Sequence, residues 1–541
     1  MKSLFKGCQQ IHWRSRAPQA WFRLCAFCLS VYLGYVTYFG KSAAFSSVGQ
    51  TVKALVLFVL LSVAYFVLLD RATALLADVA LKPKAVRDRM DLRVFALALM
   101  LALGVFGCAF AACYPGGVNY DISNQWRQVH SGEYNNWHPL LHTLFLWLMT
   151  RICDRYPFVL LVQIMLFALA LACLIAVLHK RGVPAWMALL AEGIVALTSL
   201  VRGTLMYAGK DSAMTIGVLV LTAWTIEILF SRGEWLRRPV HAVGFGAVLA
   251  VTTLLRHNAM LWTYVLIICV FFAFKACRRQ AAIAAAVMIA LLALIQGPLF
   301  GMVNVVYPDN FVDESMGIPM TILGDVKQRE PEKLDEETSA FLATLATDEE
   351  WQAVYQLHNY NSIKFTFDRE YVARRPLDEI LRMTARTATA APRTAFEAFN
   401  GLTDLVWDVS GQNESAIQVR NSGDIPEEAV GHALLNRLGG KAVGLFDAVV
   451  NLPVIRWLTQ NVGVQMLLLL LVTLWSLRQN GCGVLALALP TLVYNLGTMM
   501  LLASTDARFF QFSMTITLPV MLALAYVPKE EKTCRLRLKC F

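Results

Sequence analysis

The residues best suited to chemistry in this sequence lie in one polar stretch, residues 114–142. The stretch follows an apolar run long enough to cross a membrane, and it is rich in aromatic and turn-forming residues. Connections between helices usually contain about 2–8 residues, so a connection this long and this polar indicates a function. We interpret it as a catalytic loop at a membrane surface. Its ionisable side chains include Asp121, Arg127, His130, Glu133, His138 and His142.

Asp121 is the first candidate for a catalytic group. It follows a Pro-Gly-Gly turn at residues 115–117. A carboxylate held at the membrane surface could orient or deprotonate a hydroxyl acceptor. The structural alternative is helix capping, because Asp before Ile-Ser-Asn-Gln-Trp is a good helix start. The residues alone leave both roles open.

His138 and His142 have the i, i+4 spacing that places two imidazoles on one face of a helix. Together with Asp121 they could form an open metal site. The alternative is that residues 137–139 begin a helix in the membrane interface, where aromatic and amphipathic side chains gather. We favour a hydrogen bond from His138 to a substrate. No cofactor is evident, and these two histidines are only weak candidates for binding a divalent metal.

Four cations are predicted at the outer ends of membrane helices, where the positive-inside rule makes them uncommon. Each could lie in the interface or pair with a neighbour, as Lys210 with Asp211 or Arg508 with Asp506. The functional interpretation is binding of a phosphate or diphosphate, for which arginine offers bidentate donors. The four are Arg202, Lys210, Arg256 and Arg508.

The elements that must position these residues are membrane helices. The chain has 541 residues, 57% of them hydrophobic, and a mean hydropathy of +0.53, which is too apolar for one soluble domain. We predict an all-α polytopic bundle with about twelve spans and both termini cytoplasmic, because roughly 20 apolar residues cross a bilayer. The predicted spans are residues 21–39, 54–69, 94–113, 158–178, 185–201, 213–230, 240–255, 259–274, 281–306, 462–477, 484–502 and 509–527.

The short apolar segment 140–152 decides the topology. If it crossed the membrane, three basic loops would move to the outside; if it lies in the interface, every basic cluster is cytoplasmic. We therefore predict an interfacial or re-entrant helix there. This topology places the 114–142 loop on the same outer face as the four cations, residues 256–258 and residues 506–508. The basic clusters are Lys82/Lys84/Arg87/Arg89, Lys180/Arg181, Arg232/Arg237/Arg238, Lys275/Arg278/Arg279 and the tail 529–539.

Charge divides the chain into regions. Residues 309–461 contain 14 Lys+Arg and 24 Asp+Glu, a charge of −10. Because the whole chain has a net charge of +10, the rest of the chain carries +20. We predict a cytoplasmic tail with two extra membrane helices at 1–92 and a catalytic membrane module at 93–307. An extracytoplasmic, mainly helical insert follows at 308–461, and three membrane helices with a basic cytoplasmic tail at 462–541. Within the insert, helix is favoured at residues 334–345, 348–357, 377–388 and 427–437.

Several function classes lack support in the sequence. The basic residues are scattered over short loops, which does not indicate nucleic-acid binding. The twelve cysteines have no regular spacing, so a disulfide framework or zinc module is not expected. No Walker loop, Rossmann fingerprint or GxSxG motif is present, so an outward-facing enzyme would need an activated substrate delivered in the lipid phase. Glu192 and Glu227 are the main charges inside predicted spans, which argues against ion-coupled transport.

From residue 94 onward the chain contains a series of short motifs in a fixed order. They are Pro115-Gly116, Tyr120-Asp121, Gln125, Gly132, His138-Pro139, Lys210-Asp211, Arg256-His257-Asn258, Gly317-Ile318-Pro319 and Asp506-Ala507-Arg508-Phe509. This series resembles the GT-C fold of polyprenyl-phosphate-sugar glycosyltransferases, which include protein mannosyltransferases and the aminoarabinose transferases of lipid A. The resemblance is strongest to an uncharacterised bacterial multi-pass branch of that superfamily, and the first two predicted helices lie outside it.

The resemblance implies an inverting transfer of a sugar from a polyprenyl-phosphate donor to a glycan, lipid or protein acceptor on the outer face of the plasma membrane. Asp121 would be the catalytic carboxylate. Many GT-C enzymes have an acidic pair in this loop, and here a second acid would have to be Glu133 or Asp211. The implied substrate-binding residues are Asn119, Gln125, His138, Lys210, Asp211, Arg256, Asn258, Asp506 and Arg508.

Two other function classes remain open at this point. A flippase or exporter of lipid-linked saccharides would use the same membrane bulk without a catalytic carboxylate, and would depend on Glu192. A non-catalytic protein of envelope assembly would act through the insert.

Overall fold

The computed structural model describes residues 13–76, 86–307, 315–366, 369–410, 419, 423–431 and 436–528. Within these residues the chain is helical, and extended pairing is limited to isolated bridges such as Gly117 with Tyr207. The predicted all-α class is therefore confirmed. Of the predicted cytoplasmic clusters, Lys82, Lys84 and the tail 529–539 lie outside the described residues.

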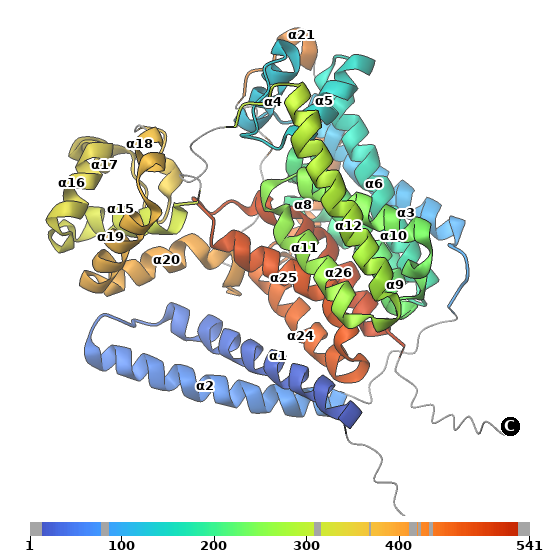
Figure 1. The fold of residues 1–541 in the computed structure, drawn as a ribbon, viewed down its shortest axis with the longest axis horizontal. Helices are drawn as coiled ribbons and strands as arrows, with labels where there is room; N and C mark the ends of the chain where they lie inside the picture. Colours follow the sequence, from blue (N-terminus) through green and yellow to red (C-terminus); the bar gives the residue numbers. More distant parts are fainter. Residues whose placement is uncertain are drawn as a thin grey trace, which may run out of the picture.

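The first helices form a hairpin below the rest of the molecule (Figure 1). Helix α1 packs against both α2 and α24. Arg478 of α24 forms an ion pair with Asp70 at 2.9 Å, and Lys41 forms one with Asp408 at 2.5 Å. The hairpin consists of α1 (Trp13–Thr37), η1 (Phe39–Lys41) and α2 (Val48–Leu75).

The central bundle is built from two parts of the chain that are separated by the insert. Its first part contains α3 (Leu92–Cys113), α4 (Tyr120–Ser131), α5 (Leu140–Ile152), α6 (Tyr156–Lys180), α7 (Ala185–Leu197), α8 (Ser199–Leu205), α9 (Lys210–Phe230), η3 (Glu234–Arg237), α10 (Pro239–Leu254), η4 (His257–Ala259), α11 (Met260–Ala273), η5 (Lys275–Cys277), α12 (Arg278–Leu294), η6 (Ile295–Leu299) and α13 (Phe300–Met302). Its second part contains α24 (Val462–Asn480), η9 (Cys482–Val484), α25 (Leu485–Met499), η10 (Ala507–Phe510) and α26 (Gln511–Tyr526). One continuous apolar core joins both parts.

Nine helices of the described chain are long and apolar enough to cross a membrane. Two bent pairs could add a span each: α7 with α8, bent by 64°, and α22 with α23, bent by 93°. The first pair corresponds to the predicted span 185–201. The predicted spans 240–255 and 259–274 correspond to shorter apolar helices. The chain is thus a polytopic membrane bundle, while twelve crossings and cytoplasmic termini stay predictions.

The short helix predicted over residues 140–152 is present as α5, which is too short to be counted among the spans. Together with α4 and α21 it lies at one end of the bundle (Figure 1). Its place in the membrane interface stays a prediction.

The part of the insert from α15 to α19 has a core of its own and lies beside the bundle (Figure 1). Helices α21 and α22 of the insert instead pack against the bundle. Three of its four predicted helices are confirmed, as α16, α17 and α19. The fourth prediction, 427–437, is correct for residues 427–430 and 436–437 but not for one continuous helix, because α21 ends at Val430. Gly431 follows with a φ of +81°, which favours glycine, and residues 432–435 lie outside the described ranges. Its elements are α15 (Gly317–Arg329), η7 (Pro331–Lys333), α16 (Glu336–Leu345), α17 (Asp348–Val354), η8 (Tyr360–Ser362), α18 (Arg369–Arg374), α19 (Leu377–Ala390), α20 (Pro392–Trp407), α21 (Glu427–Val430), α22 (Asn436–Val450) and α23 (Pro453–Thr459).

The insert contacts residues 502–504, the segment that leads into η10. The backbone N–H of Asn361 donates to the carbonyl of Ala503 at 3.0 Å, and the Asn361 amide donates to the Ser504 hydroxyl at 2.8 Å. A Cβ atom added at Gly317 would lie 1.7 Å from the carbonyl oxygen of Leu502, so only glycine permits this approach. Segment 502–504 is thus packed against the insert.

Helix α22 returns from the insert and packs against α3 of the bundle. The approach is close, because a Cβ atom added at Gly439 would lie 2.3 Å from the backbone nitrogen of Ala112. The adjacent Gly440 has open space around it. The pair of glycines thus reports on whether α22 is seated on α3.

Replacing Gly439 with alanine should lower the melting temperature of the detergent-solubilised protein, because the added methyl group collides with the α3 backbone at a typical cost of about 1–3 kcal/mol. Alanine at Gly440 should leave stability unchanged or raise it by up to about 1 kcal/mol, because alanine favours helix over glycine. Thermal unfolding followed by tryptophan fluorescence measures both variants. Equal melting temperatures would contradict the close packing of α22 on α3.

Candidate active site

A turn at residues 115–117 places the start of α4 beside the start of α9. Gly116 has a φ of +116°, which favours glycine. The N–H of Gly117 donates to the carbonyl of Met206 at 2.9 Å. The hydroxyl of Tyr156 donates to the carbonyl of Gly117 and accepts from the N–H of Ala208 at 3.1 Å. These bonds tie two segments that are about ninety residues apart in sequence, a separation across which unaided loop closure is entropically unfavourable.

The side chain of Asn119 caps α4, accepting from the N–H of Ile122 at 3.0 Å. Asp121 lies in the first turn of the helix, after the cap. The capping alternative for Asp121 is therefore wrong, because the Asn119 side chain already accepts the N–H of Ile122 at the start of the helix. The Asp121 carboxylate is left for other partners.

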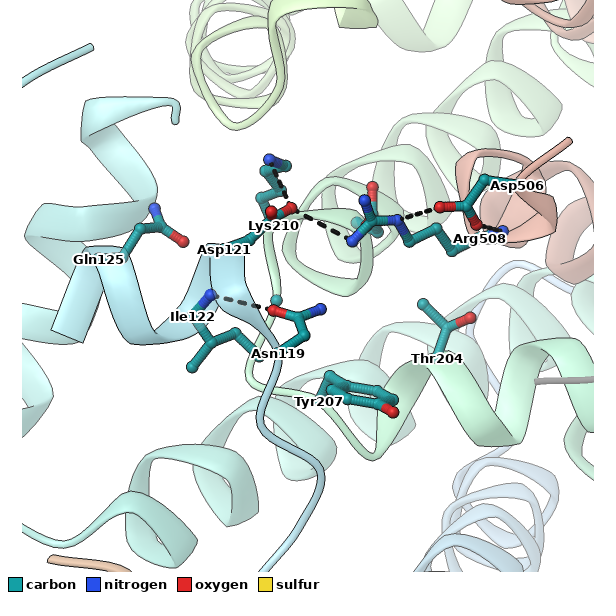
Figure 2. A pocket seen from close by; sticks show the side chains of 11 residues that line it. Asn119, Asp121, Ile122, Gln125, Thr204, Tyr207, Lys210, Asp506 and Arg508 are labelled. Carbon is teal, nitrogen blue, oxygen red and sulfur yellow. Dashed lines mark hydrogen bonds and ion pairs between the residues drawn. The ribbon is translucent and has the colours of Figure 1, made fainter. Parts of the chain in front are cut away.

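Those partners are two cations that bind the same carboxylate oxygen (Figure 2). The ammonium group of Lys210 lies 3.1 Å from Oδ2 of Asp121, and Nη1 of Arg508 lies 3.2 Å from it. Lys210 is the first residue of α9 and Arg508 belongs to η10. Three distant parts of the chain thus meet at one oxygen atom.

The charges around Asp121 determine its protonation. Burial raises the pKa of the Asp121 carboxyl, but the positive charges of Lys210 and Arg508 outweigh this effect and hold the pKa below its ordinary value. Asp121 is therefore ionised throughout the physiological range. While both cations bind it, the carboxylate is a weak proton acceptor.

His138 holds Lys210 from another direction. Its Nδ1 lies 2.9 Å from the ammonium group of Lys210. Because an ammonium group only donates, Nδ1 accepts and the neutral ring carries its proton on Nε2. Burial lowers the pKa of His138 to about 3, and the charge of Lys210 acts in the same direction. His138 is thus neutral near pH 7 and acts as an acceptor that positions Lys210.

A second, more deeply buried ion pair supports the first. Arg256 pairs with Asp211, and its Nε donates to the Asn258 carbonyl oxygen at 2.7 Å. The guanidinium carbon of Arg256 lies 4.5 Å from the centroid of the Phe509 ring, in a cation–π contact. The Asn258 amide in turn donates to the hydroxyl of Thr498 at 3.0 Å. Arg256 therefore joins α9, η10 and α25 without facing the cavity described next.

The Asp121 carboxylate faces a cavity of about 200 Å³. Most of the predicted substrate-binding residues line this cavity. His138, Arg256 and Asn258 do not line it. Sequence reasoning missed four lining residues, of which Tyr207 and Gly209 directly precede the predicted Lys-Asp pair. The cavity is lined by Asn119, Asp121, Ile122, Gln125, Thr204, Tyr207, Gly209, Lys210, Asp211, Asp506 and Arg508 (Figure 2).

Two predicted associations differ from the structure. Lys210 pairs with Asp121, not with its neighbour Asp211, whereas Arg508 pairs with Asp506 at 2.6 Å as expected. Arg202 does not join the other cations, because it forms an ion pair with Asp447 of α22. Of the two candidates for a second acid, Asp211 lines the cavity and Glu133 does not.

The predicted metal arrangement at His138 and His142 is wrong in its geometry. Helix α5 begins at Leu140 with Pro139 as its cap, so His138 precedes the helix and does not share a face with His142. Nδ1 of His142 lies 3.1 Å from the Gln125 side-chain oxygen. Within the described ranges, no group of three or more His, Cys, Asp or Glu residues could hold a metal ion. The absence of a cofactor stays a prediction.

A second cavity, of about 770 Å³, lies against the other face of α4. Trp126 and Arg127 of α4 line it, together with Asp154, Arg155 and residues in and before α21. Helix α4 thus separates the small cavity at Asp121 from a larger one of mixed charge.

Comparison with known proteins gives weak matches. No protein-family model and no curated protein matches this chain. Among solved structures, the chain is similar to the archaeal oligosaccharyltransferase AglB from Archaeoglobus fulgidus, solved with an inhibitory peptide and a dolichol-phosphate, with 12% identity and a TM-score of 0.38 over 80% of this chain and 50% of that one. It is also similar to the arabinosyltransferase EmbB from Mycobacterium smegmatis, with 12% identity and a TM-score of 0.31 over 81% of this chain and 45% of that one. The chain spans about half the length of the solved structures it matches. Likeness at this level carries no inference about the site.

The neutral state of His138 should make the stability of the protein sensitive to acid. The folded pKa of His138 is about 3, below the ordinary value of 6.5, so the unfolded chain binds more protons between these values. Stability should then fall as the pH drops below 6.5, by about 1–2 kcal/mol at pH 5 from this residue alone.

Thermal unfolding between pH 7.5 and 5 measures this effect. His138→Gln, which can still accept from Lys210, should lose less stability on acidification than the wild type does. His130→Gln changes an exposed histidine of α4 and serves as the control. Identical pH dependence in the wild type and His138→Gln would contradict the assignment.

Proposed function

We propose that this protein is a membrane glycosyltransferase that moves a sugar from a polyprenyl-phosphate-linked donor to a cell-envelope acceptor on the outer face of the membrane. The observation that carries the proposal is the meeting of Asp121 with Lys210 and Arg508 at one cavity, at the ends of apolar helices. Transfer of a glycosyl group to a hydroxyl needs both elements: a carboxylate for the nucleophile and cations for the leaving phosphate.

The donor would be bound through its phosphate. Lys210 and Arg508 offer N–H groups to the cavity, and Asp506 binds Nε of Arg508, which leaves the terminal nitrogens of the guanidinium group to face inward. These donors would stabilise the negative charge that develops on the departing phosphate. Arg256 does not line the cavity, so in this proposal it positions Asp211 instead of binding phosphate.

The acceptor hydroxyl would be aligned by Asp121. The hydroxyl oxygen attacks the anomeric carbon and forms the new C–O bond, while the bond from that carbon to the phosphate oxygen breaks. The electron pair leaves with the polyprenyl phosphate, and the hydroxyl proton passes to Asp121. Because the nucleophile and the leaving group lie on opposite sides of the anomeric carbon, this single displacement inverts its configuration. Holding both reactants in one site supplies much of the rate acceleration.

A lipid-linked donor is favoured by the surroundings of the cavity. Lys210 begins α9, which is long and apolar enough to span a membrane, and Arg508 lies at the start of another such helix. An isoprenoid chain could therefore lie between helices while its phosphate reaches the cations. The acceptor would be a glycan, a lipid or a protein of the cell envelope.

Asp121→Asn should reduce sugar transfer by at least 100-fold, because positioned general bases typically contribute about 10²–10⁴ to the rate. The measurement is transfer of label from cell-envelope lipids incubated with the purified protein. Asp154→Asn, which removes an exposed carboxylate on the other side of α4, is the matched control and should remain active. Full activity of Asp121→Asn would refute the assignment of Asp121.

Transport of lipid-linked saccharides is the second candidate, and one observation favours it. Glu192 of α7 is fully buried, and neither of its carboxyl oxygens has a hydrogen-bond partner among the described residues. Buried acids of this kind mark proton pathways in transporters. If Glu192→Gln abolished translocation in vesicles and Asp121→Asn did not, transport would replace glycosyl transfer as the function.

A further inference from the structure

We infer that the phosphate of the donor and the carboxylate of Asp121 compete for the same two cations, so that phosphate binding releases Asp121 to act on the acceptor. This inference rests on the proposed function and adds an order of events to it.

The geometry favours a competition. The donors of Lys210 and Arg508 converge on a single atom, Oδ2 of Asp121, at 3.1 and 3.2 Å. Each cation is held from another side as well, Lys210 by His138 at 2.9 Å and Arg508 by Asp506 at 2.6 Å. A phosphate oxygen that receives both donors must therefore occupy the position that Oδ2 holds here.

The charge balance points to the same conclusion. The site contains three cations and three carboxylates, which pair as Lys210 with Asp121, Arg256 with Asp211, and Arg508 with Asp506. Asp211 and Arg256 are 8% and 7% exposed, so separating that pair would leave a buried charge without a partner. An additional anion is therefore better accommodated if one of the other two carboxylates moves away from its cation.

Asp121 is the carboxylate that can leave. Asp506 accepts the backbone N–H of Arg508 at 3.0 Å and is thereby built into the start of η10. The Asp121 side chain has no such backbone role, because Asn119 caps α4. Rotation of the Asp121 side chain therefore costs no helix cap, whereas displacement of Asp506 does.

Release changes the chemistry of Asp121. In the ion pair its pKa is held below the ordinary value by Lys210 and Arg508, against the effect of burial. Once phosphate neutralises these cations, that influence is lost and the carboxylate becomes a stronger base. The Asp121 carboxylate thus becomes a strong base only when the phosphate of the sugar donor is bound. The acceptor hydroxyl is therefore not deprotonated before the sugar donor is in place.

The experiment measures binding of farnesyl phosphate, and separately of inorganic phosphate, to the full-length protein in detergent by calorimetry. Competition predicts that Asp121→Asn binds farnesyl phosphate more tightly than the wild type, by a factor on the order of ten, because a carboxylate no longer holds the cations. Lys210→Met should bind it more weakly. Tightening with inorganic phosphate as well would identify phosphate alone as the competitor; tightening confined to farnesyl phosphate would identify the lipid phosphate.

Asp506→Asn is the control for net charge. It removes the same charge from the other side of Arg508, but it also loses the group that orients the guanidinium, so binding should be unchanged or weaker. Equal tightening in both variants would reduce the effect to net charge and overturn the inference, as would unchanged or weaker binding by Asp121→Asn. Asp121→Ser, which is too short to bridge the cations, is the second variant if the first does not fold.

The outcome is separable from that of the proposed function. Tighter binding by Asp121→Asn, together with no sugar transfer by the wild type, would refute the glycosyltransferase and leave the competition standing. Loss of transfer in Asp121→Asn with unchanged affinity for farnesyl phosphate would refute the competition and leave the function standing.

Discussion

The docking of the turn at residues 115–117 onto the chain just before α9 is the contact on which the candidate site depends. The hydrogen bond from Gly117 to Met206, and the two bonds made by the Tyr156 hydroxyl, bring the starts of α4 and α9 together. Asp121 and Lys210 each lie within the first turn of their helix, so their separation follows from that contact. In an apolar bundle such backbone bonds are strongly favoured, since unpaired peptide groups there are costly.

The position of Arg508, the third charged residue at Asp121 and Lys210, depends on contacts with the insert. Arg508 follows the segment 502–504. The insert contacts this segment through hydrogen bonds from Asn361 and through the close approach at Gly317. The same insert returns to the bundle through α22, on α3. The contacts of the insert with segment 502–504 therefore help to set the position of Arg508.

Most of the residues predicted from the sequence to bind substrate line one cavity, and the predictions that differ from the structure do so for physical reasons. Asp121, Lys210 and Arg508 were placed on one side by the parity of the basic loops, which depends on charge and hydropathy alone. The same reasoning included Arg202, which instead pairs with Asp447, because the partner lies in a helix whose packing no local pattern reveals. His138 contacts Lys210 through its neutral ring, a role that depends on burial, and its predicted contact with a substrate stays a prediction.

The sequence by itself determined that this chain is an all-helical membrane bundle, because hydropathy acts over the length of a single helix. It also identified which polar residues could not be explained by membrane insertion. Only the tertiary structure decided which carboxylate meets which cation. Asn119, two residues before Asp121, takes the helix cap, and Asp211, next to Lys210, binds Arg256 instead. Those choices depend on side-chain directions at the ends of three helices, and the packing of the whole bundle sets these directions.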